Sequence, residues 1–147
     1  MKGMKKLAWF GLLLALPVLA QATTVTFSAL TVREVGSFLT NLPTDFYGLQ
    51  PAAAKQMMDT MEVFILDVRE PNEFQAGRIP GAVNIPVREL PKRMGELPKG
   101  IKPIIVYCGS GHRGGMALVF LKGQGYNVKN IIGGFKAWSD AKLPVEK

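Results

Sequence analysis

Short apolar runs alternate with helical patterns from residue 63 onward, and this alternation restricts the possible folds more than any other feature of the chain. The runs that we expect to form strands are residues 63–66, 81–85, 103–107 and 127–131. The helical patterns between and after them are residues 86–94, 114–122 and 133–138. Strands that alternate with helices are typical of βαβ units, and therefore of a parallel sheet.

The chain before residue 63 has a different pattern, which is mostly helical. Apolar residues follow a 3.6-residue period over residues 32–42, which predicts an amphipathic helix. Pro51 suits the first position of a second helix, which we expect to run through residue 58. The whole chain has 48% hydrophobic and 20% charged residues, which fits one globular domain and excludes a disordered or coiled-coil protein.

Residues 1–22 have the three parts of a secretory signal peptide. Three lysines come first, an apolar run covers residues 7–20, and small residues end the segment at Ala22. Crossing a bilayer takes about 20 apolar residues. The run here has 14 and contains Pro17, so we expect cleavage after Ala22 rather than a permanent anchor.

Export of the mature chain follows from this signal, and we expect a periplasmic or secreted protein. The predicted organisation is a signal peptide at 1–22, an N-terminal helical extension at 23–48 and one domain at 49–147. Three of the 18 basic residues lie in the signal, which reduces the formal net charge from +7 to +4 for the mature chain. Much of the excess of basic over acidic residues therefore lies in the predicted signal peptide.

Cys108 is the only cysteine. An exported chain with one cysteine forms no internal disulfide, so the thiol is either buried and inert or kept for chemistry. One cysteine and one histidine do not make a zinc site, and we expect no metal and no organic cofactor.

The residues after Cys108 favour the reactive interpretation. Gly109, Ser110, Gly111, His112 and Arg113 follow it, between a buried strand and a helix, where α/β sheets place their ligands. Two glycines allow backbone N–H groups to converge on an anion at the positive end of that helix. The same setting favours the nucleophilic thiolate form of Cys108. The guanidinium of Arg113 suits an oxyanion. We therefore predict a catalytic Cys108 and an anion-binding loop.

The loop and two further motifs resemble the single-domain rhodaneses. Cys108, Gly111 and Arg113 match that family's pattern of Cys, two residues, Gly, one residue and Arg. Residues 67–74 with 77–86 resemble its upstream motif, and residues 133–138 resemble its C-terminal motif. The resemblance implies an α/β fold with a five-stranded, mainly parallel sheet and helices on both faces.

The chain departs from the family pattern at two positions. Gly114 stands where many relatives have Ser, and Arg78 stands where many have His. We expect the first to weaken one hydrogen bond to the loop and the second to change a structural contact.

Sulfur transfer is the activity that the resemblance implies. A small anionic donor such as thiosulfate would give its outer sulfur to Cys108, and the resulting persulfide would pass it to a thiol or to cyanide. A protein is a possible acceptor. The substrate-binding residues would be those of the loop, which are Gly109, Ser110, Gly111, His112 and Arg113.

Two other functions remain as alternatives. The same pocket could carry a persulfide or sense an oxidant without turnover, with the helix at 32–42 as a docking element. Phosphate or arsenate ester chemistry is the third reading, but related phosphatases have five residues between Cys and Arg, and this loop has four. Nucleic acid is not an expected partner, because Glu89 and Glu96 interrupt the basic stretch formed by Arg88, Lys92, Arg93, Lys99 and Lys102.

Several polar residues near these motifs fit either a catalytic or a structural role. We expect His112 to be an exposed residue that shapes the entrance, since loop dipoles activate the cysteine without a base. Ser110 suits either an oxyanion donor or a turn former. Four charged residues resemble an acid and base site, but we expect an ion-pair set that holds loops around the sheet, namely Asp67, Arg69, Glu73 and Arg78.

Overall fold

The computed structural model describes residues 27–147, so the predicted signal peptide lies outside the described residues. The chain divides into two compact units, with the division between Ser37 and Phe38. Helix α1 (Ala29–Thr40) contains this division and corresponds to the helix expected at 32–42. No residue of α1 is buried. Among residues 27–147 no helix is both long enough and apolar enough to cross a membrane.

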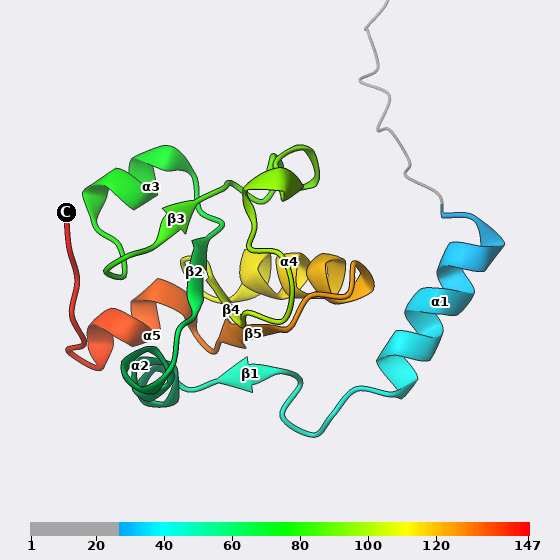
Figure 1. Ribbon diagram of the computed structural model, residues 1–147, viewed down its shortest axis with the longest axis horizontal. Helices are drawn as coiled ribbons and strands as arrows, with labels where there is room; N and C mark the ends of the chain where they lie inside the picture. Colours follow the sequence, from blue (N-terminus) through cyan, green and yellow to red (C-terminus); the bar gives the residue numbers. More distant parts are fainter. Residues whose placement is uncertain (1–26) are drawn as a thin grey trace, which may run out of the picture. The chain divides into compact units, whose positions relative to one another are not determined.

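The second unit contains a five-stranded sheet in the order β1-β5-β4-β2-β3 (Figure 1). Its strands are β1 (Gly48–Leu49), β2 (Phe64–Asp67), β3 (Val83–Asn84), β4 (Ile104–Tyr107) and β5 (Val128–Ile131). Each of the four pairings between neighbouring strands is parallel. The expected five-stranded, mainly parallel α/β sheet is confirmed.

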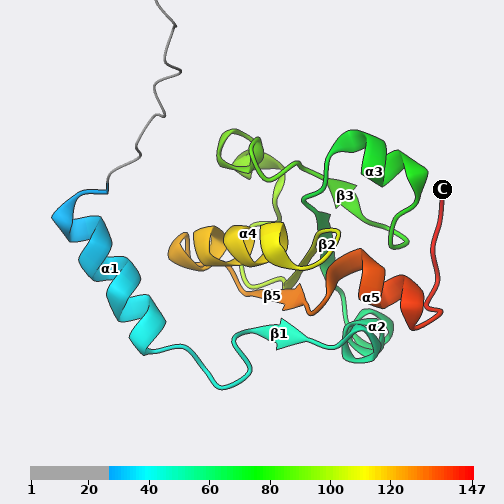
Figure 2. The ribbon, with the colours of Figure 1, turned by 180° about the vertical axis from the view of Figure 1, so that it is seen from behind.

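Helices cover both faces of the sheet (Figure 2). The helices of this unit are α2 (Pro51–Thr60), α3 (Pro71–Ala76), α4 (His112–Gly123) and α5 (Gly134–Asp140). Buried residues of α4, such as Leu118, pack on one face. Ala54 of α2 and Trp138 of α5 pack on the other. The expectation of helices on both faces is therefore confirmed.

Side chains of the central strands alternate between the two faces because successive residues of a strand point in opposite directions. Ile104 and Val106 lie in the core beneath α4, whereas Ile105 and Tyr107 lie in the core beneath α2 and α5. All four residues of β4 are buried. Both cores therefore meet at this strand, and the residue after it, Cys108, joins the α4 side.

The expected α-helix at 86–94 is wrong. The structure has two short 3₁₀ helices there, Leu90–Lys92 and Met94–Glu96. The N–H of Val87 donates to the carbonyl of Val68, so the chain continues along the edge of the sheet before it turns. Proline at position 91 also has no N–H to contribute to an α-helix.

Two short elements, β1 and α3, were not anticipated from the apolar periodicity. Strand β1 has two residues, and α3 has six. Elements of this length contain too few residues to show a period. Both are fixed by neighbours: β1 by its pairing with β5, and α3 by a capping box in which Glu70 and Glu73 each accept from the other's backbone N–H.

Candidate active site

Cys108 lies directly after β4, at the carboxyl end of the central strand, with 1% of its surface exposed. The N–H of Gly111 donates to its Sγ at 3.1 Å. Gly111 has a φ of 106°, a conformation that favours glycine, and this turns its N–H back toward the thiol. The sulfur therefore lies inside the curve of the loop, with one N–H already directed at it.

The first two carbonyl groups of the loop are bound by the N-terminus of α5. The N–H of Phe135 donates to the Cys108 carbonyl at 2.7 Å, and that of Lys136 donates to the Gly109 carbonyl at 3.0 Å. In a trans peptide the N–H points opposite to the C=O. Because these carbonyls face α5, the N–H groups of Gly109 and Ser110 face away from it.

Gly134 makes this contact between α5 and the loop possible. A Cβ at this position would lie near the Cys108 carbonyl oxygen and 2.9 Å from the carbonyl carbon and oxygen of Gly109. Its φ of 60° is also one that residues with side chains rarely adopt. Gly134 thus has a physical reason to stand where α5 meets the loop.

Helix α4 begins at His112, so its positive end faces the loop. Gly111 is the N-cap residue, and its carbonyl accepts the N–H of Gly115 at 2.8 Å. Free N–H groups at such a helix end bind anions. The loop therefore combines a thiol, convergent N–H groups and a helix N-terminus around one point.

Arg113 connects the loop to α3 through an ion pair with Glu73. Its two terminal nitrogens donate to the two carboxylate oxygens at 2.6 and 2.8 Å. Glu73 raises the pKa of Arg113 above its ordinary value, and the thiol of Cys108 raises it further. In return, the Arg113 guanidinium holds the pKa of Glu73 below its ordinary 4.5. The guanidinium therefore stays charged between the carboxylate and the sulfur.

The other charged residues of the upstream motif form separate ion pairs. Arg69 pairs with Asp67 and donates to the Gly77 carbonyl, and its guanidinium lies 4.2 Å from the centre of the Phe135 ring. Arg78 pairs with Glu146 at 2.9 Å. These two pairs hold chain segments together as the sequence suggested, whereas Glu73 faces the loop.

Ser110 and His112 lie at the exposed side of the loop. The Ser110 Oγ and the His112 Nδ1 are 3.1 Å apart, within hydrogen-bond distance. Among the described residues, neither side chain forms a hydrogen bond with the thiol or with Arg113, and both residues are exposed. Their place at the entrance agrees with the expectation for His112, and it leaves both roles of Ser110 open.

A surface pocket of about 310 Å³ lies away from this loop. It is lined by Lys99, Gly100, Gln124, Gly125 and Tyr126, which lie before β4 and after α4. It contains neither the thiol nor the Glu73–Arg113 pair. Within residues 27–147, no three His, Cys, Asp or Glu side chains are placed to hold a metal ion. We therefore assign the candidate site to the Cys108 loop.

Residues 50–141, which contain the sheet, the loop and α5, match the family model of the Rhodanese-like domain. The chain belongs to this family. The loop at the end of β4 lies within this domain, where residues of two further motifs contact it.

Relatives agree with this assignment. A sulfurtransferase of Allochromatium vinosum is 39% identical over 93 residues, which are 63% of this chain and 86% of the relative. The thiosulfate sulfurtransferase GlpE of Vibrio cholerae is 30% identical over 69% of this chain and 95% of its own length. A crystal structure of a rhodanese-related protein from Thermoplasma volcanium is 31% identical with a TM-score of 0.63, covering 67% and 96% of the two chains.

Two parts of the site were not recognised as such in the sequence. Glu73 was grouped with structural charges, although it binds Arg113, which is 40 residues away. The N-terminus of α5 was noted as a motif, but its bonds to the loop carbonyls were not. The only available signal was that both segments belong to motifs of one family.

Proposed function

We propose that this protein is a sulfurtransferase that moves sulfane sulfur through a persulfide on Cys108. The observation that carries the proposal is the Gly111 N–H directed at the Cys108 sulfur, inside a loop whose first carbonyls are bound from outside. A negatively charged sulfur is stabilised by such N–H groups both before and after it accepts a second sulfur. The names of two relatives, sulfurtransferase and thiosulfate sulfurtransferase, support the same chemistry.

The first half-reaction is a displacement at sulfur. The Cys108 thiolate attacks the outer sulfur of thiosulfate, a new S–S bond forms, and the old S–S bond breaks. Sulfite leaves with the electron pair of the broken bond, and the enzyme keeps a persulfide anion. Arg113 is suited to attract the donor's oxyanion, because the guanidinium stays charged in its ion pair with Glu73.

The second half-reaction restores the enzyme. A thiolate or cyanide attacks the terminal sulfur of the persulfide, and the Cys108 thiolate leaves with the electron pair of the S–S bond. The product is a new persulfide or thiocyanate. Each step conserves atoms and electrons, so neither step calls for a metal or an external oxidant.

The deciding experiment is intact mass spectrometry of the reduced protein before and after thiosulfate, followed by cyanide. We expect the mass of one sulfur atom to appear and then to be removed by cyanide. Cys108→Ser is expected to gain no sulfur while it remains folded. Because the chain has one cysteine, any sulfur retained by the serine variant would contradict the assignment.

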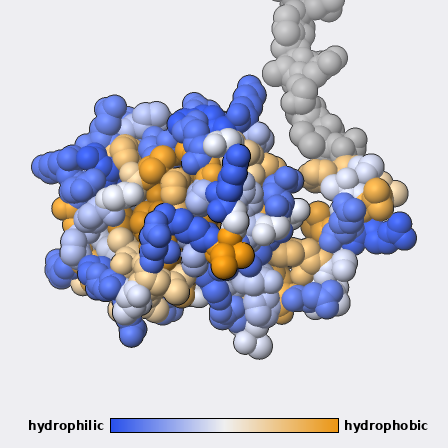
Figure 3. Space-filling model, in the orientation of Figure 1, coloured by the Kyte–Doolittle hydropathy of each residue, from blue (hydrophilic) through white to orange (hydrophobic). Residues whose placement is uncertain are grey.

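A second candidate, a persulfide-carrying or redox-sensing module without turnover, is favoured by α1. Several apolar residues of this helix are exposed, including Leu30 at 57%, Val32 at 58% and Leu39 at 55%. Figure 3 shows apolar residues at the surface of the α1 segment. Deletion of residues 23–44 tests this candidate. Loss of partner capture, with unchanged stability of the domain, would favour the module.

The site of action belongs to the proposal as well, and we propose that the enzyme works after export. The support is the sequence of residues 1–22 alone. Mass spectrometry of the protein from cell fractions tests this directly. A chain beginning at Thr23 in the exported fraction is the expected result, and an intact N-terminus in the cytoplasm would contradict it.

A further inference from the structure

Asn130 is a partly buried polar residue of β5 that lies outside the sequence motifs. It lies two residues after Val128, which is part of the core beneath α4, so its side chain is on the α4 face of the sheet. Its Nδ2 donates to the Gly111 carbonyl at 3.4 Å. This contact connects the neighbouring strand to the centre of the Cys108 loop.

The Gly111 carbonyl belongs to the peptide that ends in the His112 N–H. Because C=O and N–H point in opposite directions, a partner on this carbonyl directs the His112 N–H the other way. The carbonyls of Cys108 and Gly109 are bound by α5 in the same manner. The Gly111 carbonyl already accepts the N–H of Gly115 within α4, and Asn130 is the side chain that adds a second donor to it from the neighbouring strand.

The position of the Asn130 amide depends on Gly114. A Cβ at residue 114 would overlap the Asn130 Oδ1 and lie 3.2 Å from its Cγ. The Oδ1 is buried and has no hydrogen-bond partner among the described residues. An unpaired buried oxygen is costly, so the amide is not held by this atom. The contact of its Nδ2 with the Gly111 carbonyl accounts for the orientation of the amide.

We propose that Asn130 is a positioning residue for sulfur transfer, which acts through the Gly111 carbonyl in the space left by Gly114. It does not touch the donor; it holds the second half of the loop in the conformation that stabilises the sulfur anion. This inference rests on the proposed function. It also explains why glycine stands at position 114: the Asn130 amide occupies the volume of its side chain.

The test compares Asn130→Ala and Asn130→Asp with the unchanged full-length protein. The aspartate keeps the shape but replaces the donor with an acceptor. We expect kcat for thiosulfate to fall about fivefold in the alanine variant, as for one lost hydrogen bond, and further in the aspartate variant. KM for thiosulfate should stay unchanged, because the donor does not contact Asn130.

Asn127→Ala and Asn127→Asp are matched controls. Asn127 is an exposed asparagine directly before β5, and we expect both variants to keep the original kcat. Thermal unfolding of every variant separates a loss of folded protein from a loss of activity. A fall in activity that only follows the folded fraction, or a kcat equal to that of the unchanged protein, would overturn the proposal.

A second pair of variants tests the role of Gly114. Gly114→Ala should displace the Asn130 amide and lower kcat at least as much as Asn130→Ala. In the double variant the added methyl group has room, so its kcat should equal that of Asn130→Ala alone. Losses that multiply in the double variant would show that the two residues act independently, and would overturn the coupling.

The rate of Cys108 alkylation by iodoacetamide is measured on the same proteins. Alkylation needs no sulfur donor, so it remains informative if thiosulfate fails to load the unchanged protein. In that case the proposed function fails. Slower alkylation in the Asn130 variants alone would then still show that Asn130 positions the loop around Cys108, and an unchanged rate would show that it does not.

Discussion

Two arginines of this domain are each held by a carboxylate, in two very different surroundings. Arg69 and Asp67 lie at the carboxyl end of β2, with 5% and 0% of their side chains exposed. Arg113 and Glu73 lie at the loop, with 31% and 34% exposed. Both carboxylates come from one sequence motif, residues 67–74. Burial, rather than residue type, separates the pair inside the domain from the pair at the Cys108 loop.

The buried pair is bound closely to other protein groups. Arg69 binds both oxygens of Asp67 and the Gly77 carbonyl, and its plane lies against Phe135 and Tyr107. The Arg113 pair is instead about one third exposed, at the loop that contains Cys108. The comparison teaches that a guanidinium can bind a ligand only where its protein partners leave part of it exposed, and among these two arginines that is Arg113.

The largest effect is expected from Arg69→Met, which leaves Asp67 buried without a counter-charge. Removing one partner of a buried ion pair costs roughly 3–5 kcal/mol, so we expect a fall of about that size in the free energy of unfolding. Urea denaturation measures it. The fraction that remains folded should still load sulfur, because Cys108 and its loop are unchanged.

Lys136→Met is the matched control, because it breaks an exposed ion pair of α5 with Asp140. Its effect on unfolding should be close to zero. Equal losses in Arg69→Met and Lys136→Met would contradict the assignment of the first pair to the stability of the fold.

Glu73→Gln should lower activity and leave the stability of the fold nearly unchanged, which is the reverse of what we expect for Arg69→Met. The amide cannot hold Arg113 with two charged bonds, so we expect kcat/KM for thiosulfate to fall about tenfold through loss of orientation. The unfolding free energy should change by less than about 1 kcal/mol, because the pair is one third exposed. Steady-state kinetics and urea denaturation on one preparation give both values.

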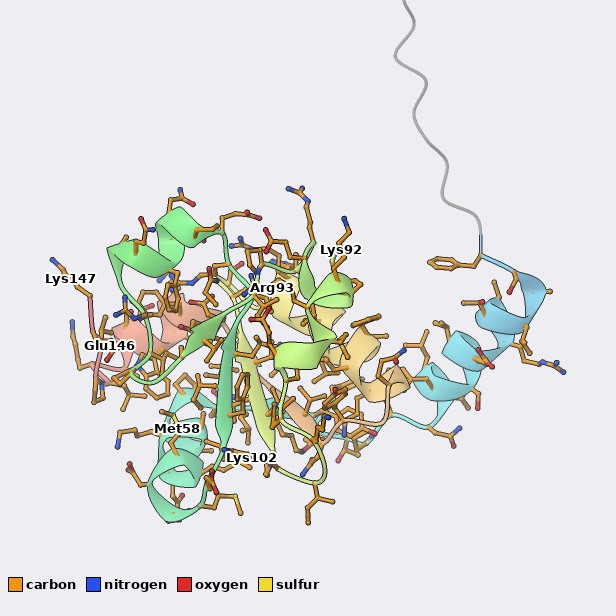
Figure 4. All side chains as sticks on the ribbon, turned by 45° about the horizontal axis from the view of Figure 1, so that its top comes forward. Met58, Lys92, Arg93, Lys102, Glu146 and Lys147 are labelled. Atoms are coloured by element: carbon orange, nitrogen blue, oxygen red, sulfur yellow. The ribbon has the colours of Figure 1, made fainter. Side chains whose placement is uncertain are left out.

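Glu62→Gln serves as the control for this substitution. Glu62 pairs with Lys102, which comes before β4 and therefore lies at the other end of that strand from Cys108 (Figure 4). Activity should be unchanged in this variant. A fall in both variants would assign the loss to surface charge in general rather than to Arg113.

The pH dependence of stability should report the same ion pair. Arg113 lowers the pKa of Glu73 below 4.5, so the pair contributes stability that is fully present above pH 4.5. The contribution is lost as the pH falls through the lowered pKa. The difference in unfolding free energy between the unchanged protein and Glu73→Gln should therefore be constant above this pH and shrink below it, and growth toward acid would contradict the assignment.

The smallest effect is expected from Glu146→Gln. Glu146 lies on the C-terminal segment, and its carboxylate, 43% exposed, pairs with Arg78 (Figure 4). The backbone bonds between residues 78 and 146 remain in the variant. We expect a change of about 0.5 kcal/mol or less in urea denaturation. A loss of unfolding free energy as large as that of Arg69→Met would show that this pair stabilises the fold as strongly as the buried pair does.

Sequence patterns were sufficient for the long elements and for the loop. The strands around residues 63–66 and 103–107 were found because apolar residues with two buried faces form continuous runs. The helix expected at 114–122 corresponds to α4, which the structure has at His112–Gly123. In contrast, β1 and α3 are too short to show a period, and the segment after residue 86 was assigned to an α-helix although its backbone pairs with the sheet edge.

The sequence by itself determined the class of the fold, the position of the only thiol at the end of a buried strand, and the glycines that allow the loop to curl around it. These properties are local, since they depend on period, on backbone freedom and on neighbours in the chain. Only the tertiary structure decided that Glu73 holds Arg113, that α5 binds the loop carbonyls, and that Asn130 fills the space beside Gly114. Such contacts join residues that are distant in the chain, and no local pattern specifies which of several carboxylates or amides will meet a given partner.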